Sequence, residues 1–328
     1  MNRIYLLATI SILTSLSSFG QNHLIEQTLL GKANPIFLNP GFAGASGTPR
    51  IVTNGQLFQS TPTNSGDLNH FSGSFDFYSK KLHGGISARA NVAQYYTNSP
   101  ANYFRKIHIA YAPKFSSGNR ITISPAIEIG VALPADNFNP NAHSVTGLGA
   151  LVNTKKSYFG IFHSVAWAEF RKIHSSRIHG GSSIEINNKF SAGAECLLTS
   201  QIWSKSTTFS LSPIRHLAGQ ITGSITYDKF KVFAGLHNSS VRFLEENQQP
   251  DVSIRSTLTP IFGASYQGKR IGLHVAYLTE RTSSITGLNM QGNIDPVFQD
   301  PIKTTNPGMF EFIASYAFQK KDAKEKSH

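Results

Sequence analysis

Residues 120–133 read RITISPAIEIGVAL, and this stretch decides the fold because two kinds of side chain alternate along it. Isoleucine, valine, leucine and one proline occupy the odd positions, while small or polar residues and one glutamate occupy the even positions. Successive side chains of a β-strand point to opposite faces, so a period of two predicts a strand with one apolar face and one polar face. Pro125 lacks a backbone donor, which predicts a bulge or a local break in the ladder.

The same alternation recurs along the chain and predicts an all-β body over residues 50–319. About fourteen segments show it, starting near residues 50, 69, 82, 102, 120, 157, 176, 189, 205, 218, 229, 255, 269 and 309. Short turns such as Gln267-Gly268-Lys269 separate many of them, whereas residues 134–155 and 281–307 read as long connections. Short turns at one end and long loops at the other are typical of outer-membrane barrels. The predicted fold is a transmembrane outer-membrane β-barrel of about 14 antiparallel strands.

The first twenty residues predict export by the Sec pathway. Arg3 gives a positive start, residues 4–16 form a short apolar core, and small residues at Ser18 and Gly20 precede a cleavage site before Gln21. With a barrel, this signal peptide predicts an integral protein of the cell outer membrane, in contact with its lipid. Cys196 is the only cysteine, so neither an internal disulfide nor a cysteine-based metal site is expected.

The stretch NPIFLNPGFAG, residues 34–44, carries two Asn-Pro pairs just before the first predicted strand. Proline fixes φ and lacks a donor, and the residue before it is pushed out of the α region. We therefore expect an irregular segment or a series of turns here, with no helix. Its six motif residues are Asn34, Pro35, Asn39, Pro40, Gly41 and Gly44.

Six charges lie within predicted strands on the less apolar face: Arg89, Lys106, Glu128, Glu185, Glu195 and Glu311. If the apolar face meets lipid, these side chains point into the lumen, where the carboxylates would pair with Arg89 and Lys106. They could instead form an acid cluster with shifted pKa values. A periplasmic or secreted β-sandwich would turn the same charges toward water, and alternation alone does not separate the two folds.

The chain is basic, with 30 Lys and Arg against 18 Asp and Glu. These charges are scattered between the predicted strands and in a polar tail at residues 320–328, so no nucleic-acid partner is expected. They suit solvated loops or contact with anionic lipid headgroups. There is no G-x-S-x-G motif and no H-E-x-x-H pairing, so we expect no enzyme, no catalytic or cofactor-binding residues and no metal site.

Both ends of the mature chain resemble a known family. The opening at residues 34–44, and the closing stretches RIGLHVAYL (270–278) and GMFEFIASYAF (308–318), are similar to the PorP/SprF family of type IX secretion system membrane proteins of Bacteroidetes. Gly41 replaces the family's usual alanine, and Tyr277 is followed by Leu278 where the family has Tyr-Asp. The resemblance implies a FadL-like barrel in which residues 21–49 form an N-terminal hatch, inside or under the barrel.

The resemblance also implies a function. Family members work with the type IX translocon, and some help to secrete, or to retain at the surface, large cargo proteins with a C-terminal secretion domain, including adhesins of gliding motility. For this chain the resemblance implies a non-enzymatic accessory protein of that system. The alternative is a FadL-like outer-membrane transporter of a small hydrophobic ligand. That function would need a continuous apolar pocket beside the hatch and a lateral opening in the wall, for which Pro125 is the candidate position.

Overall fold

The computed structural model describes residues 33–58, 68–95, 102–118, 120–133, 143–168, 171–204, 214–243, 253–256, 258–279, 281–286, 302–306 and 308–318. The predicted signal peptide, residues 21–32 of the hatch and the tail at 320–328 lie outside these ranges. Within them, no helix is long and apolar enough to cross a membrane.

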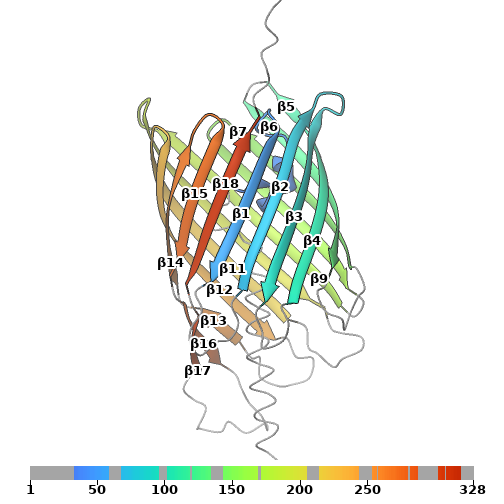
Figure 1. Cartoon of the computed structure of the whole chain (residues 1–328), viewed down its shortest axis with the longest axis vertical. Coiled ribbons are helices and arrows are strands. Elements are labelled where there is room, and N and C mark those ends of the chain that lie inside the picture. The colour runs from blue at the N-terminus through green and yellow to red at the C-terminus, as the bar shows by residue number, and fades with distance from the viewer. Residues whose placement is uncertain are drawn as a thin grey trace, which may run out of the picture.

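Fourteen antiparallel strands form a closed barrel, which confirms the predicted fold (Figure 1). The ring closes where the first strand pairs with the last, from Arg50 opposite Ala317 to Phe58 opposite Met309. A closed ring leaves no unpaired edge, so the backbone can satisfy its own hydrogen bonds in lipid. The ring strands are β1 (Arg50–Phe58), β2 (Leu68–Ser79), β3 (Gly84–Tyr95), β4 (Asn102–Pro113), β6 (Ile121–Leu133), β7 (His143–Thr154), β8 (Ser157–Ala168), β9 (Arg171–Glu185), β10 (Phe190–Trp203), β11 (Ile214–Tyr227), β12 (Phe230–Phe243), β14 (Thr259–Gln267), β15 (Ile271–Leu278) and β18 (Met309–Ala317).

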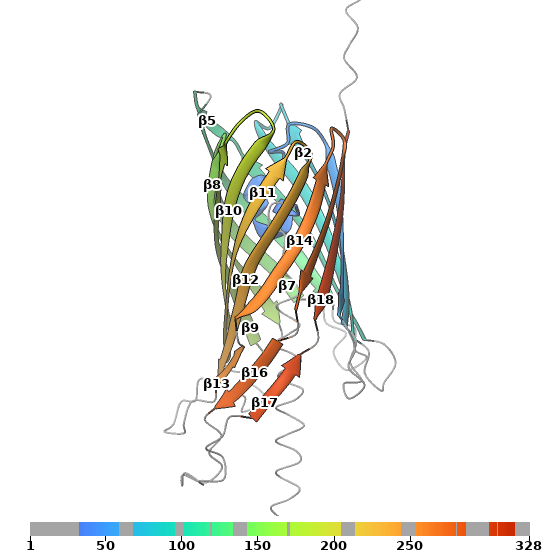
Figure 2. The same ribbon diagram turned by 90° about the vertical axis from the view of Figure 1, so that its left-hand side faces the viewer.

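Four short strands lie outside the ring. β5 (Phe115–Ser117) follows β4 and pairs with β6. β13 (Ser253–Ser256) pairs with the end of β12 and with β16 (Arg281–Thr286), which pairs with β17 (Ile302–Asn306). Figures 1 and 2 show β13, β16 and β17 as an extension beyond one end of the barrel.

The apolar face of the strands is the outer surface of the barrel. On β6, Ile127 and Ile129 are 53% and 59% exposed, whereas Glu128 between them is 1% exposed. A soluble sandwich would bury the isoleucines and expose the glutamate, so the sandwich alternative is wrong. The exposed apolar band is the surface that an outer-membrane barrel presents to lipid.

The two ends of the barrel differ in the length of their connections. Two residues join β7 to β8 and two join β11 to β12, at the end where β1 begins and β18 stops. At the opposite end most connections are longer, such as residues 134–142 and 205–213, although only two residues separate β8 from β9. Outer-membrane barrels keep short turns in the periplasm and longer loops outside. The short-turn end therefore corresponds to the periplasmic side, and the extension of β13, β16 and β17 to the outside.

Two stretches interpreted as loops contain strands. Residues 143–154 form β7 in the wall, so 134–155 is not one long connection. That strand carries two inward-facing glycines, Gly147 and Gly149, and lacks the strong contrast between faces that marks β6. Residues 281–307 contain β16 and β17. The segment expected to start near residue 205 lies, up to residue 213, outside the described residues.

The lipid-facing surface yields a depth-dependent prediction. Replacing Ile129, in the middle of β6, by Arg should cost about 2–4 kcal/mol of folding free energy, because a charge then faces the bilayer midplane. Ile184→Arg, next to the end of β9, should cost about 0–1 kcal/mol. Urea unfolding in lipid vesicles, followed by tryptophan fluorescence, measures both. Equal losses at the two positions would contradict the assigned membrane depth.

Candidate functional site: the hatch and the polar lumen

The described part of the hatch, residues 33–49, lies inside the short-turn half of the barrel (Figure 1). Its Asn-Pro motif forms two short helical turns, the α-helix α2 (Pro35–Leu38) and the 3-10 helix η1 (Pro40–Phe42). The expectation that this stretch contains no helix is therefore wrong. Each proline occupies the first position of its helix, where the missing N–H costs nothing and the fixed φ already suits a helix. Asn34 and Asn39 precede the two turns in non-helical conformations, as residues before proline should.

Asn39 fastens the hatch to the barrel wall. Its Oδ1 accepts a hydrogen bond from the Gly41 amide at 2.8 Å. Its Nδ2 lies 3.1 Å from the Ala150 carbonyl of β7 and 2.9 Å from the Ile161 carbonyl of β8. The same nitrogen is 3.0 Å from Nε2 of His179 on β9. One fully buried amide thus joins the hatch to three neighbouring strands.

Three more polar contacts hold the hatch backbone. The Gly44 amide donates to Oδ1 of Asp76 at 3.0 Å, and Arg50 donates to the other oxygen of that carboxylate at 3.0 Å. Lys114, which follows β4, donates to the Gly41 carbonyl at 2.6 Å. The Arg177 guanidinium donates to the Phe37 carbonyl. Burial lowers the pKa of Lys114 to about 8, while the Asp76 charge acts in the opposite direction.

The wall is shaped for close approach by the hatch. A Cβ placed on Gly85 of β3 would lie 1.8 Å from the Ala43 carbonyl oxygen, so no side chain fits there. Gly44 has φ +65°, a conformation that favours glycine. The apolar side chains of the hatch pack against alanine, leucine and tyrosine side chains of the wall. These side chains are Ile36, Leu38, Phe42 and Ala43, and their wall partners are Ala112, Ala126, Leu151, Tyr158 and Leu197.

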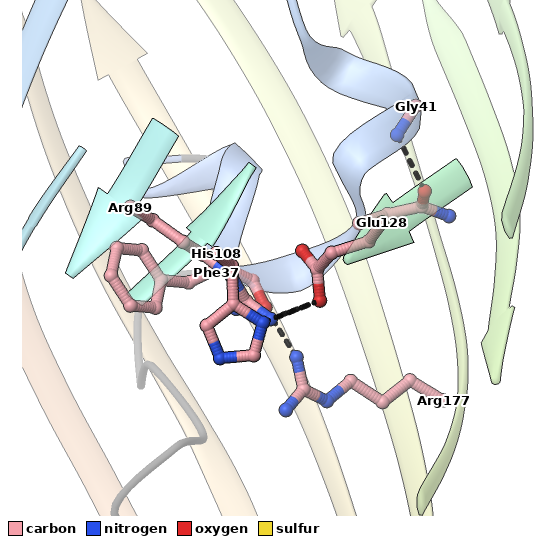
Figure 3. Close-up of polar contacts among 7 residues, drawn as sticks. Phe37, Gly41, Arg89, His108, Glu128 and Arg177 are labelled. Atoms are coloured by element: carbon pink, nitrogen blue, oxygen red, sulfur yellow. Dashed lines mark hydrogen bonds and ion pairs between the residues drawn. The ribbon is translucent and has the colours of Figure 1, made fainter. Parts of the chain in front are cut away.

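Beneath the hatch lies a buried charge network (Figure 3). The Glu128 carboxylate accepts a hydrogen bond from Arg89 at 2.7 Å and lies 3.0 Å from Nδ1 of His108. Arg89 also stacks over the Phe37 ring, 5.2 Å from its centroid. Figure 3 shows these side chains converging with Arg177 beside the hatch backbone. Because Glu128 is 1% exposed, its charge is compensated inside the protein.

The other predicted lumen charges have different surroundings. Lys106 is on the same inward face of β4 as His108, and its charge interacts with those of Glu128 and Arg177 in this network. Glu195 lies 3.2 Å from Lys231 and accepts a 3.4 Å hydrogen bond from Tyr158. Glu311 is fully buried between β18 and β1. The single acid cluster considered from the sequence is therefore absent from the described lumen. Glu128 pairs with Arg89 and interacts with Lys106, whereas Glu195 and Glu311 have other partners.

Two amides hold Glu311 in place. Asn54 and Gln56 of β1 each donate to its Oε1 at 2.9 Å, across the seam that closes the ring. This contact is made only because β1 and β18 are neighbours, so sequence reasoning missed both partners. The hydrogen bonds of Glu311 therefore connect a buried charge in the lumen with the pair of strands that closes the barrel.

Glu185 is not a lumen charge, contrary to expectation. Its position on β9 has the inward parity, but it is the last residue of the strand, and its side chain is 73% exposed at the rim, 3.8 Å from Lys156. Sequence reasoning also missed Arg177 and His179, which hold the hatch. Both flank Ile178 in an alternating stretch, and that alternation could have identified them.

In the described residues, no group of three His, Cys, Asp or Glu side chains could hold a metal ion. A cavity of about 430 Å³ lies in the lumen beside the hatch, lined by residues of β1, β9 to β12, β14, β15, β18 and the hatch. Its lining includes many hydroxyl groups and several charges, among them Ser224, Ser265 and Lys231. It is not the apolar pocket that the transporter alternative requires.

Comparison with known proteins gives structural similarity alone. No protein-family model matches the chain, and a search of curated proteins finds no match. The monoaromatic hydrocarbon channel CymD is 10% identical, with a TM-score of 0.44 over 88% of this chain and 93% of its own. A bacterial polysaccharide outer membrane secretin is 8% identical, with a TM-score of 0.45 over 83% of this chain and 99% of its own. A Pseudomonas aeruginosa FadL homologue is 11% identical, with a TM-score of 0.39 over 83% of this chain and 89% of its own.

Replacing each of the two asparagines of the motif by alanine should change the stability of the protein by very different amounts. Asn39→Ala leaves the Gly41 amide and two wall carbonyls without their side-chain partner and should cost at least about 2 kcal/mol. The Asn34 amide is equally buried but has no hydrogen-bond partner in the described part of the chain. Asn34→Ala should therefore change stability by less than about 1 kcal/mol. Unfolding in urea, monitored by heat-modifiable gel mobility, compares the two. A larger loss for Asn34→Ala would refute the assigned role of Asn39.

The two glutamates Glu128 and Glu185 form a second matched pair. Glu128→Gln removes the anion that compensates buried Arg89, so we expect a loss of about 3–5 kcal/mol. Glu185→Gln alters an exposed rim residue and should stay within about 0.5 kcal/mol. Chemical unfolding of both variants in lipid vesicles measures the difference. Similar small losses would mean that the network under the hatch does not stabilise the barrel.

Proposed function

We propose that this outer-membrane barrel is a non-enzymatic accessory protein of type IX secretion, which assists the secretion or surface retention of large cargo proteins. The observation that carries the proposal is the fastened hatch. The Asn-Pro motif that resembles the PorP/SprF family is the segment bound to the wall by Asn39, Lys114 and Arg177. A motif with that placement fits a barrel whose lumen is closed.

The interior supports a scaffold better than an open pore. Asn39 in the hatch, Glu128 on β6 and Glu311 on β18 are each at most 1% exposed, although β6 and β18 lie on different sides of the lumen. An aqueous channel would leave such groups accessible to water. With the lumen closed, binding falls to the surface at the long-loop end, where loops on a rigid scaffold commonly carry function.

The extension of β13, β16 and β17 is the candidate docking surface at that end. It is tied to the barrel by β12, where Ser240 lies opposite Arg255, and it projects beyond the ring (Figure 2). β17 pairs with β16 on one side, from Arg281 opposite Asn306 to Ile285 opposite Ile302. An extension of this kind can offer backbone contacts to a secreted protein without opening the barrel.

The transporter alternative would need an opening at Pro125. β4 pairs with β6 as far as Tyr111 opposite Ile127, and β5 resumes the pairing at Phe115 opposite Ile123 in the same register. The ladder is therefore interrupted only where Pro125 lacks its N–H, and the two strands stay in register past it. The polar cavity does not favour a transporter either.

Affinity purification of the tagged protein from its native outer membrane tests the proposal. We expect type IX translocon subunits or a large surface protein with a C-terminal secretion domain. A variant with residues 281–306 replaced by a short Gly-Ser loop should lose the cargo and keep its heat-modifiable mobility, because none of the fourteen ring strands is altered. Recovery of neither partner from the unmodified protein would reject the proposal, and a co-purifying apolar ligand would favour the transporter.

A further inference from the structure

The cavity beside the hatch is built from hydroxyl groups. Ser191, Ser224, Ser265 and Ser315 come from β10, β11, β14 and β18, and all four line the same space of about 430 Å³. The apolar residues of the lining are alanines, and their methyl groups, together with the carbon atoms of the polar residues, make up about half of its surface. Small-molecule sites of this volume are usually lined mainly by hydrophobic side chains. The serine hydroxyls of this site can instead form hydrogen bonds with a ligand.

The lining of the cavity also carries charged side chains. Four cationic side chains line it, Arg50, Lys229, Lys231 and Arg270, against the two carboxylates of Glu195 and Asp228. Asp228 and Lys229 form the turn between β11 and β12, and Arg270 lies in the turn before β15, so these charges surround the periplasmic mouth. When Asp76, the ion-pair partner of Arg50, is counted as well, one net positive charge remains, and it favours anions from that side.

The inner wall of the cavity adjoins the hatch. Lys231 and Glu195 are 3.2 Å apart, and their side chains are 28% and 19% exposed. Glu195 also accepts a hydrogen bond from Tyr158, whose ring packs edge-on against Phe42 of the hatch at 5.5 Å. The pair therefore forms a polar floor between the cavity and the hatch, and the cavity opens toward the short turns.

We propose that this cavity is a binding site, entered from the periplasm, for a small polyhydroxylated anion such as a sugar acid. The hydroxyl-lined wall recognises the hydroxyl groups of the ligand, and the cations at the mouth recognise its acidic group. The site is distinct from the proposed cargo surface at the opposite end of the barrel. Failure of cargo capture therefore leaves this proposal unaffected, and the reverse holds as well.

Calorimetric titration of the purified full-length protein in detergent tests the site with four probes: D-glucuronate, D-glucose, sulfate and laurate. Glucuronate should bind more tightly than glucose, and added salt should weaken it, because screening reduces the attraction of exposed charges. Ser265→Phe fills the cavity and should weaken glucuronate binding about tenfold or more. Ala264→Phe places the same ring on the lipid side of the same strand and should leave binding unchanged.

Lys229→Gln separates the anionic preference from the hydroxyl recognition. Lys229 is an exposed turn residue at the mouth, so its loss should weaken glucuronate binding about threefold and leave glucose unchanged. Absence of glucuronate binding would overturn the proposal, as would binding that survives Ser265→Phe. Sulfate binding as tight as glucuronate would reduce the site to an adventitious anion site. Preferential binding of laurate would replace the proposal with an apolar-ligand site.

Discussion

The hydrogen bonds between β1 and β18 are the contact on which the rest of the structure depends. Strands that face lipid must pair all their backbone groups within the protein, and only a closed ring does so. Once Arg50 lies opposite Ala317, the register of the ring determines which side chains face inward. Period-two alternation then sends most isoleucine, valine and leucine side chains outward. It brings Glu128, Arg89 and Glu311 into the lumen, together with an apolar cluster that includes Val52, Ile261 and Ile313.

Charges enclosed in this way need partners, because water does not reach them. Arg89 and His108 surround Glu128, and two amides of β1 hold Glu311. The hatch takes part in the same compensation by supplying backbone groups: the Phe37 and Gly41 carbonyls accept hydrogen bonds from Arg177 and Lys114. The hatch and the charged wall therefore stabilise each other, because the carbonyl groups of the hatch and the cations of the wall form these hydrogen bonds with one another.

Much of this architecture can be predicted from local pattern. Alternation identifies the barrel, its lipid face and the inward charges Arg89, Glu128 and Glu311. It fails for β7, where Gly149 removes the contrast between faces because the hatch amide of Asn39 approaches within contact of that position. It also fails for Glu185, since strand parity does not tell where a strand ends at the rim.

Pairing partners lie beyond the reach of the sequence. Asn39 meets Ala150, Ile161 and His179 only after the ring has closed and the hatch has entered it. The prolines of the motif were interpreted as helix breakers, although each starts a helical turn. The sequence rule for proline describes its effect in the interior of a helix, where it breaks the hydrogen-bond pattern. In this motif each proline is instead the first residue of a helical turn, and packing of the hatch against the wall determines that position.

Hydrogen–deuterium exchange of the intact protein in detergent tests the central claim most directly, namely that the Asn-Pro motif is docked in the lumen. The account predicts that amides of residues 34–44 exchange as slowly as those of the ring strands β3 and β7, and far more slowly than the exposed turn at residues 186–189. Exchange of the motif at the rate of that turn would show that the segment is not held inside the barrel, and would contradict the account.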